Sequence, residues 1–288
     1  MPIQAPAPWR WPLPPAPTRP QGPSSSEEPS SAPFPAARAA TRNPIHSPAA
    51  RPLARSPTGR GPQYNRRKLL MQELWTKLAA RAGLALDQQQ AALLGRYLDL
   101  LLEANRRMNL TRIRDRAAAE VQHVGDALTL LPFLPAGPHR LADVGSGGGV
   151  PGIPLAIVRP DVAVTLIEST QKKARFLRDA AGALGLANVT VIADRAENLA
   201  PGRFDAVVAR AVAPLEDLVR WCLPLLRPGG RLLAMKGPRV NEELPAAIRA
   251  CRKLGGGAPV VHPAPLPGAE DHVIVEVNRG PIPASSHR

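Results

Sequence analysis

The stretch Asp143-Val144-Gly145-Ser146-Gly147-Gly148-Gly149-Val150-Pro151-Gly152 decides which fold this sequence predicts. It follows a short β-branched run and precedes a helical pattern, which is the context that a ligand-binding glycine loop requires. Glycines let a backbone approach a ligand closely, and the start of a helix favours a negative group. Five glycines between a strand and a helix therefore indicate a binding loop rather than an ordinary turn.

Around this loop, short β-branched runs alternate with helical runs, which is typical of a parallel sheet covered by helices on both faces. We therefore expect an α/β fold with a doubly wound, mainly parallel sheet. Strands are expected near Leu141–Val144, Val162–Ile167, Val189–Ile192, Asp205–Ala209, Leu232–Lys236 and Val273–Val277, with helices at 151–158, 171–184, 214–226 and 242–254. Residues 259–265 predict a further strand, although Pro263 and Pro265 disfavour a strand at this place.

Three helical patterns precede the glycine loop and predict a small helical cap over residues 66–137. The first runs over 68–83, the second begins after the N-cap residue Asp87, and the third spans about 115–131. The main ligand-binding domain is expected to follow over 138–280, with a tail at 281–288.

Residues 1–65 differ from the rest of the chain in composition. They hold 17 of the 35 prolines and seven arginines, with no lysine and two glutamates. Such a segment cannot bury enough apolar surface to offset the entropy of ordering it, which predicts a disordered extension. A transit peptide, a basic tail that helps to hold RNA, and a true start at Met71 are alternative interpretations.

The charge balance points to a polyanionic partner. The chain carries +14 (37 − 23), and residues 66–288 alone carry +9 (30 − 21), which favours contact with nucleic acid. Two cysteines exclude a disulfide-rich scaffold and a four-cysteine zinc site, and we expect no metal. The sequence contains neither 18 uninterrupted apolar residues nor a secretory signal pattern, so a cytoplasmic protein without membrane contact is expected.

The identity of the ligand depends on residues beyond the loop. Read from Gly147, the loop satisfies Gly-x-Gly-x-x-Gly, so a nicotinamide cofactor is an alternative. Glu168, at the end of the next expected strand, suits the ribose hydroxyls of a dinucleotide or of S-adenosylmethionine equally. Two further observations favour S-adenosylmethionine: the polar segment Asp194–Glu197 suits an adenine edge, and the loop offers no basic residue for a pyrophosphate.

The residues from Asn109 to Lys236 resemble the bacterial small-subunit ribosomal RNA methyltransferase G family, also called GidB. The similarity spans about 71–278 and lies in Asn109-Leu110-Thr111, His123-x-x-Asp126, the glycine loop through Leu155, Lys172-Lys173 with Phe176-Leu177, Arg195-Ala196-Glu197, Ala209-Arg210-Ala211-Val212-Ala213 and Leu233-Ala234-Met235-Lys236-Gly237. The sequence departs from the family pattern at three positions that the resemblance places on the RNA-facing side, Arg112, Gln122 and Ala127.

The resemblance implies a Rossmann-like class I S-adenosylmethionine-dependent methyltransferase that modifies N7 of one guanine in 16S rRNA. Its partner would be 16S rRNA, the small ribosomal subunit or an assembly intermediate of that subunit, and we infer no obligate protein partner. It also implies a cofactor pocket formed by Gly145, Val150, Ala196, Glu197 and Arg210.

Elimination among methyl acceptors points the same way. Methylation of pyrimidine C5 needs a cysteine nucleophile, but the two cysteines lie in expected helices. Methylation of an exocyclic amine usually involves an Asp/Asn-Pro-Pro-aromatic turn, and none follows the fourth strand. For ribose methylation, only Lys236 is suitably placed. Guanine N7 already offers a lone pair, so positioning supplies most of the acceleration and no general base is needed. A methyltransferase of another RNA position or of a small molecule, a non-catalytic RNA-binding module and an NAD-dependent oxidoreductase are the alternatives.

Several side chains are candidates for contact with ligand or RNA. Arg210 is expected to position the methionine carboxylate or guanine O6. Gly147 and Glu168 join it in the expected cofactor site, and the candidates for substrate contact are Asn109, His123, Lys172, Lys173 and Lys236. Two basic patches are candidates for phosphate binding, Lys172-Lys173-Arg175-Arg178 and Arg106-Arg107-Arg112-Arg114-Arg116.

Overall fold

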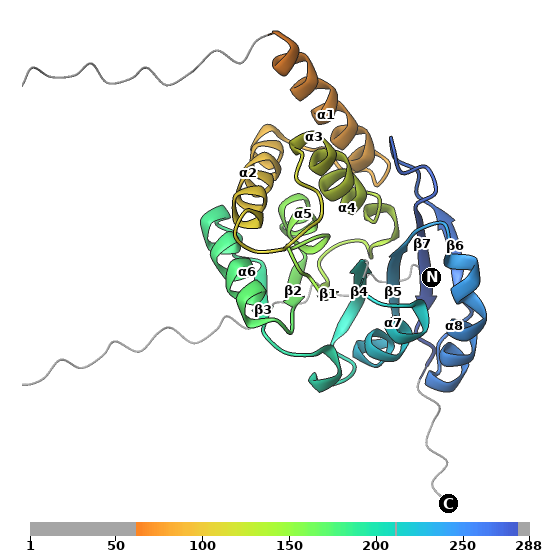
Figure 1. The fold of residues 1–288 in the computed structure, drawn as a ribbon. Helices are drawn as coiled ribbons and strands as arrows, with labels where there is room; N and C mark the ends of the chain where they lie inside the picture. The colour runs from red at the N-terminus through yellow and green to blue at the C-terminus, as the bar shows by residue number, and fades with distance from the viewer. Residues whose placement is uncertain (1–61, 211, 282–288) are drawn as a thin grey trace, which may run out of the picture. The chain divides into compact units, whose positions relative to one another are not determined.

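The structure, a computed structural model, describes residues 62–210 and 212–281, with side chains from Leu70 onward. The expected extension 1–65 and tail 281–288 lie almost entirely outside these residues. The described part contains a seven-stranded sheet of order β3-β2-β1-β4-β5-β7-β6 (Figure 1). Within the described part, no helix is long and apolar enough to cross a membrane.

The sheet is mainly parallel, which confirms the predicted fold class. Its parallel part consists of β1 (Arg140–Val144), β2 (Ala163–Ile167), β3 (Val189–Ile192), β4 (Phe204–Arg210) and β5 (Leu226–Lys236). Two antiparallel strands, β7 (Val273–Asn278) and β6 (Val260–Pro263), complete the edge beside β5. The expected strand at 259–265 is thus present, and Pro263 is tolerated because β6 is an edge strand.

The strand side chains alternate between two hydrophobic cores. Leu141 faces one core with α5 (Gly152–Val158) and α6 (Gln171–Leu184), whereas Ala142 faces the other with α7 (Leu215–Cys222) and α8 (Val240–Leu254). Helices that follow β1 and β2 cover one face, and helices that follow β4 and β5 cover the other (Figure 1). The winding therefore reverses between β1 and β4, and open α/β sheets bind ligands at the carboxyl ends of such strands.

The helices before β1 pack on the first of these cores. They are α1 (Pro62–Ala80) and α2 (Gln88–Asn105), followed by α3 (Arg116–Ala119), η1 (Glu120–Gly125), α4 (Asp126–Leu128) and η2 (Leu131–Phe133). Asp87 caps α2 in a capping box with Gln90, as its sequence position predicts. The single helix expected over 115–131 is wrong in detail, because its middle, η1, is a π-helical turn.

Other boundaries also differ from the expectation, and α1 spans Pro62–Ala80 instead of 68–83. The helix expected over 214–226 ends at Cys222, and a 3-10 turn, η4 (Leu223–Leu225), follows because Pro224 cannot continue an α-helix. β5 therefore begins at Leu226, six residues earlier than expected, and its pairing with β4 shifts register between Phe204 and Ala206. Another 3-10 turn, η3 (Ala196–Asn198), follows β3.

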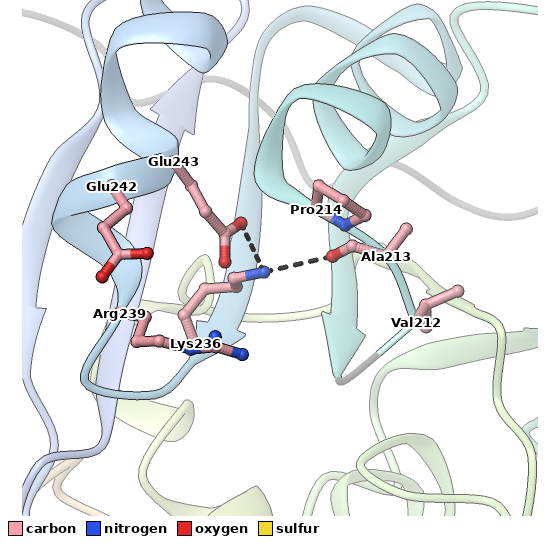
Figure 2. A pocket seen from close by; sticks show the side chains of 7 residues that line it. All are labelled: Val212, Ala213, Pro214, Lys236, Arg239, Glu242 and Glu243. Carbon is pink, nitrogen blue, oxygen red and sulfur yellow. Dashed lines mark hydrogen bonds and ion pairs between the residues drawn. The ribbon is translucent and has the colours of Figure 1, made fainter.

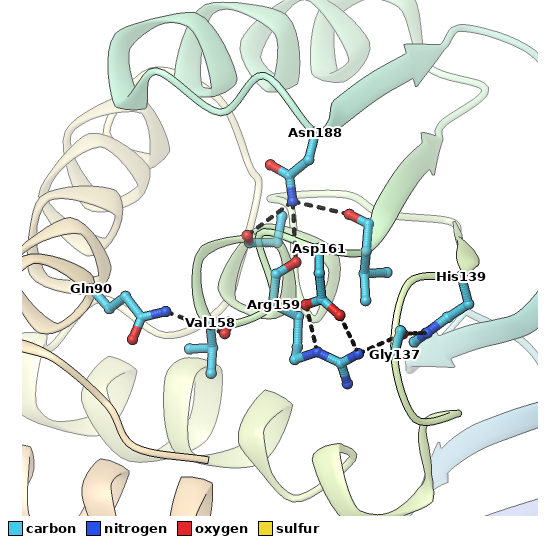
Figure 3. Close-up of polar contacts among 9 residues, drawn as sticks. Gln90, Gly137, His139, Val158, Arg159, Asp161 and Asn188 are labelled. Carbon is cyan, nitrogen blue, oxygen red and sulfur yellow. Dashed lines mark hydrogen bonds and ion pairs between the residues drawn. The ribbon is translucent and has the colours of Figure 1, made fainter. Parts of the chain in front are cut away.

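A polar cluster holds the amino edge of the sheet opposite the glycine loop (Figure 3). The Asn188 side-chain amide donates to the carbonyls of Ala156, Arg159 and Val162 at 3.0, 3.3 and 3.0 Å. The buried Arg159 guanidinium pairs with Asp161 and also donates to a loop carbonyl. Asn188 thereby satisfies carbonyl groups where α5 ends and β2 begins, groups that no regular secondary structure would pair.

Asn188→Ala should lower the free energy of unfolding by about 2–3 kcal/mol, because the partly buried carbonyls of Ala156 and Val162 lose their side-chain donor. Urea unfolding followed by circular dichroism measures the change. Asn198→Ala is the matched control, since the Asn198 amide bonds only to the exposed Asp194 carboxylate, and we expect a change below about 0.5 kcal/mol. Equal effects of the two substitutions would contradict the structural role of Asn188.

Candidate functional site

The glycine loop joins β1 to α5 and is held on two sides by hydrogen bonds. Gly145 donates its N–H to the carbonyl of Ile167, at the end of β2, at 2.9 Å. From the helical cap, the buried Tyr97 hydroxyl donates to the carbonyl of Gly148 at 2.8 Å. Three glycines have positive φ, a region that residues with side chains rarely adopt: Gly145 (71°), Gly147 (54°) and Gly149 (93°).

Asp143 is fully buried beneath the loop, at the end of β1. Its Oδ2 accepts the N–H of Gly152, the first residue of α5, at 3.0 Å. Burial raises the pKa of Asp143 to about 7, although the bond from Gly152 opposes this shift. This carboxyl therefore joins the two elements that flank the loop.

Glu168 follows β2 and lies against the same loop. Its Oε2 accepts the N–H of Gly147 at 2.9 Å, and its Oε1 accepts the N–H of Thr170 at 2.8 Å. The residue is 5% exposed, so these bonds fix the carboxylate at the floor of the site. Each oxygen retains the capacity to accept a further hydrogen bond.

Arg210 ends β4 and crosses to the π-helical turn of the cap. Its Nη1 donates to the Gln122 carbonyl at 2.6 Å and to Asp126 Oδ2 at 3.2 Å, and its Nη2 donates to His123 Nδ1 at 3.1 Å. The Arg210 side chain is 20% exposed and that of Asp126 is 4% exposed, so this ion pair is no surface salt bridge. Arg210 therefore fastens the cap to the carboxyl edge of the sheet.

His123 is buried between Arg210 and the segment that precedes the third helix. Because Nδ1 accepts from the guanidinium, the proton of the neutral ring lies on Nε2, which faces the Thr111 hydroxyl at 3.1 Å. Burial, followed by the nearby Arg210 charge, lowers the pKa of His123 to about 4. The ring is therefore neutral near pH 7.

This shift has a consequence for stability. An unfolded His123 would bind a proton below its ordinary pKa of 6.5, whereas the folded protein does so only near 4. The free energy of unfolding should therefore lose about 3 kcal/mol from this residue as the pH falls through that window. In His123→Gln, denaturant midpoints measured from about pH 7 to about pH 4 should fall less steeply, and an unchanged slope would contradict the buried neutral ring.

One cavity of about 1390 Å³ lies at the carboxyl edge of the sheet and brings most of the predicted residues together. Its lining includes nine of the candidates, Asn109, His123, Gly145, Gly147, Val150, Glu168, Lys173, Arg210 and Lys236. Lys172, Ala196 and Glu197 are not part of this lining. Lys172 and Lys173 are successive residues of α6 and so point in different directions. Ala196 is buried and Glu197 is exposed in η3, so their predicted role stays a prediction.

The two basic patches differ in how freely their charges face solvent. In the patch formed by residues 106–116, Arg106 and Arg107 both pair with Glu103, and Arg116 pairs with Asp99 and Glu120. Two of its members, Arg112 and Arg114, instead line the cavity, as do Lys173 from the α6 patch and Arg239 after β5. Members of both basic patches therefore lie at the cavity, where their charges could meet an RNA backbone.

A smaller hollow of about 440 Å³ adjoins the cavity between α7 and α8 (Figure 2). Within it, Lys236 Nζ donates to the Ala213 carbonyl at 3.1 Å and pairs with Glu243 Oε2 at 2.7 Å. The Lys236 side chain is only 10% exposed. Its charge is therefore neutralised by Glu243, and its contacts hold the segment after Arg210 against α8.

The sequence reasoning missed part of this network. Thr111 and Asp126 belong to segments that carry the family resemblance, but no role was inferred for them. His272, whose Nδ1 lies 3.1 Å from Asp126 Oδ1, was not singled out. A single histidine 146 residues away from its partner gives no local signal. Cys222 and Cys251 are buried in α7 and α8, as expected. Among the described residues, no cluster of His, Cys, Asp or Glu could hold a metal ion.

Comparison with known proteins gives a family. The model of the family described as rRNA small subunit methyltransferase G (GidB) matches residues 90–264. Proteins named Ribosomal RNA small subunit methyltransferase G include one from Sorangium cellulosum, 52% identical over 58% of this chain and 73% of its own length. Those from Chloroflexus aggregans and Aromatoleum aromaticum are 44% and 47% identical, over 70% and 68% of this chain and 87% and 93% of their own lengths. The chain therefore belongs to the rRNA small subunit methyltransferase G family.

Proposed function

We propose that this chain transfers a methyl group from S-adenosylmethionine to N7 of a guanine in 16S ribosomal RNA. The substrate would be the RNA or the small ribosomal subunit, which places the enzyme in the cytoplasm. The proposal rests on family membership and on one observation, the cavity that unites the glycine loop, Glu168 and the Arg210 network. The surplus of basic residues around that cavity supports a polyanionic substrate.

The residues of the cavity fit S-adenosylmethionine, which supplies a methyl group on a positively charged sulfur. A side chain added at Gly147 would meet nothing closer than the Gly145 carbonyl at 3.8 Å, so the space beside this glycine is open. Both Glu168 oxygens can accept a further hydrogen bond, as ribose hydroxyls require. The volume exceeds that of a typical small-molecule pocket and leaves room for a nucleotide beside the cofactor.

Two of the groups that could remove a proton, His123 and Lys236, are engaged in other contacts. His123 accepts from Arg210 and faces Thr111, and Lys236 is paired with Glu243. Guanine N7 needs no deprotonation before attack, because its lone pair is free at neutral pH. The reaction then depends on holding nucleophile, methyl carbon and sulfur in line, which positioning residues can supply.

Arg210 is the residue placed to position both ligands. Its guanidinium has five N–H groups, of which three bond to the π-helical turn, His123 and Asp126. The remaining N–H groups suit the methionine carboxylate or guanine O6. Because its other bonds fix the plane of the guanidinium, those donors are preorganised.

The test is methyl transfer from labelled S-adenosylmethionine to small-subunit RNA, and to intact small subunits, from cells that lack this activity. We expect label in 16S rRNA, and mass spectrometry should identify it as 7-methylguanosine. Large-subunit RNA from the same cells is the control and should stay unlabelled. Label in another nucleoside, or no label although calorimetry detects cofactor binding, would contradict the proposal.

A further inference from the structure

His272 closes the wall of the cavity that is contributed by the antiparallel end of the sheet. It lies in the segment between β6 and β7 and lines the cavity with its neighbours Val273 and Ile274. The described cavity lining contains no phenylalanine, tyrosine or tryptophan, and its aromatic side chains are those of His123 and His272. His123 is 1% exposed, whereas the His272 side chain is 34% exposed. His272 is therefore the ring that a substrate in this cavity can reach.

Backbone contacts fix the position of His272. The Ala264 N–H donates to the His272 carbonyl at 2.8 Å, which continues the pairing of the two strands. The His272 N–H donates to the Ala269 carbonyl, and Leu266, in the same connecting segment, is buried in the core. The side chain thus projects from a packed segment.

The orientation of the ring follows from its contact with Asp126. Nδ1 lies 3.1 Å from Asp126 Oδ1, and a carboxylate oxygen accepts, so Nδ1 carries the proton. The second oxygen of Asp126 accepts from Arg210, so one buried carboxylate orients both side chains. Nε2 lies on the other side of the ring, and no partner for it is found among the described residues.

We propose that His272 contacts the RNA substrate through Nε2, which in the imidazolium form donates a hydrogen bond to an acceptor oxygen of a guanine carbonyl or of a phosphate. This inference rests on the proposed function of the cavity. His272 is then a substrate-contacting residue that the buried Asp126 carboxylate orients.

The protonation state of His272 decides whether Nε2 can donate. Asp126, through its hydrogen bond and its charge, raises the pKa of His272, while partial burial and Arg210 oppose this and Asp271 adds to it. With Nδ1 always protonated, Nε2 is a donor below the pKa of His272 and an acceptor above it. The contribution of His272 to RNA turnover should therefore be present at lower pH and disappear as the pH rises through that pKa.

Two substitutions separate the roles of the two ring nitrogens. His272→Asn retains a donor near Asp126 but does not reach the substrate, so kcat/KM for RNA should fall about ten- to a hundredfold at low pH. His272→Gln carries an uncharged donor near the position of Nε2, so it should recover part of that loss and abolish the decline at high pH. S-adenosylmethionine affinity, measured by calorimetry, should stay within about twofold of the parent chain in both variants.

His262→Gln is the matched control. His262 belongs to the neighbouring strand β6 and also pairs with a carboxylate, Glu276, at 3.1 Å, but it is not part of the cavity lining. Its variant should keep the parent pH profile, kcat and KM. If His272→Asn behaves like this control while the parent forms 7-methylguanosine, the contact is absent and the proposed function stands. If the parent chain methylates no guanine N7, the proposed function itself fails.

The source of the acceptor oxygen follows from the same variants. A phosphate contact predicts that His272→Asn raises KM and lowers the slope of log affinity against log salt by about one. A contact with the guanine carbonyl predicts that His272→Asn lowers kcat and leaves the salt slope unchanged. The parent chain should then show the same loss in kcat when the target guanine is replaced by 2-aminopurine, which lacks the O6 carbonyl. An unchanged kcat/KM at every pH would overturn the proposal for both sources.

Discussion

Replacing Gly145 with aspartate should weaken S-adenosylmethionine binding by about a hundredfold or more. Gly145 has a φ of 71°, and a Cβ at this position would meet the two methyl carbons of Val212 at 2.6 and 2.9 Å. Accommodating aspartate therefore requires the loop or the Val212 segment to move, and both line the cavity. The added carboxylate would also place an unpaired charge in the cavity, which costs free energy. Titration calorimetry measures the affinity.

Backbone strain alone does not account for such a loss. Gly202→Asp introduces the same side chain at a φ of 69°, where nothing lies within 4 Å of the added Cβ. Gly202 is exposed before β4 and does not line the cavity. This control should lose stability through the left-handed conformation but keep its affinity for the cofactor. If Gly145→Asp retains the affinity of the control, the glycine loop does not hold the cofactor.

Arg210→Lys should reduce kcat for methyl transfer by about a hundred- to a thousandfold, with a smaller effect on cofactor affinity. A lysine ammonium is one point charge, whereas the guanidinium donates from Nη1 and Nη2 to three partners on the cap. The substitution keeps a positive charge beside the buried Asp126, which limits the loss of stability. Single-turnover assays at saturating cofactor measure the effect on the chemical step.

Arg227→Lys is the matched control for this substitution. Arg227 also pairs with a buried aspartate, Asp205, at 2.5 Å, but it lies at the start of β5, at the opposite edge of the sheet. The control should retain full turnover, and thermal unfolding should show that both variants are folded. Equal turnover in the two variants would remove Arg210 from its proposed positioning role.

The sequence was most informative where its signals were local. The glycine loop, the strands around it and the N-cap of α2 follow from short-range patterns, and the structure has them at the expected residues. The π-helical turn was missed because its apolar spacing resembles that of a regular helix. Within this turn, the carbonyl of Gln122 meets Arg210, a residue 88 positions later. Such a contact depends on the assembled fold and leaves no trace in local periodicity.

In the candidate site, too, local sequence signals were informative and contacts between distant residues were not. Gly147, Glu168 and Arg210 could be proposed because each follows a strand whose carboxyl end was predictable. Lys236 lines the cavity, yet its neutralisation by Glu243 depends on how α8 packs, which the sequence does not reveal. Sequence positions therefore sufficed to select candidates that line one cavity, whereas the ion pairs of these residues required the structure.

The sharing of Asp126 also matters during synthesis of the chain. The carboxylate is made 84 residues before Arg210 and 146 residues before His272. A nascent chain that ends before His272 already contains the glycine loop but has only one of the two side chains, Arg210, that bond to this carboxylate. The network around Asp126 is complete only when residue 272 has been translated, so a chain that terminates earlier carries the glycine-loop sequence without this network.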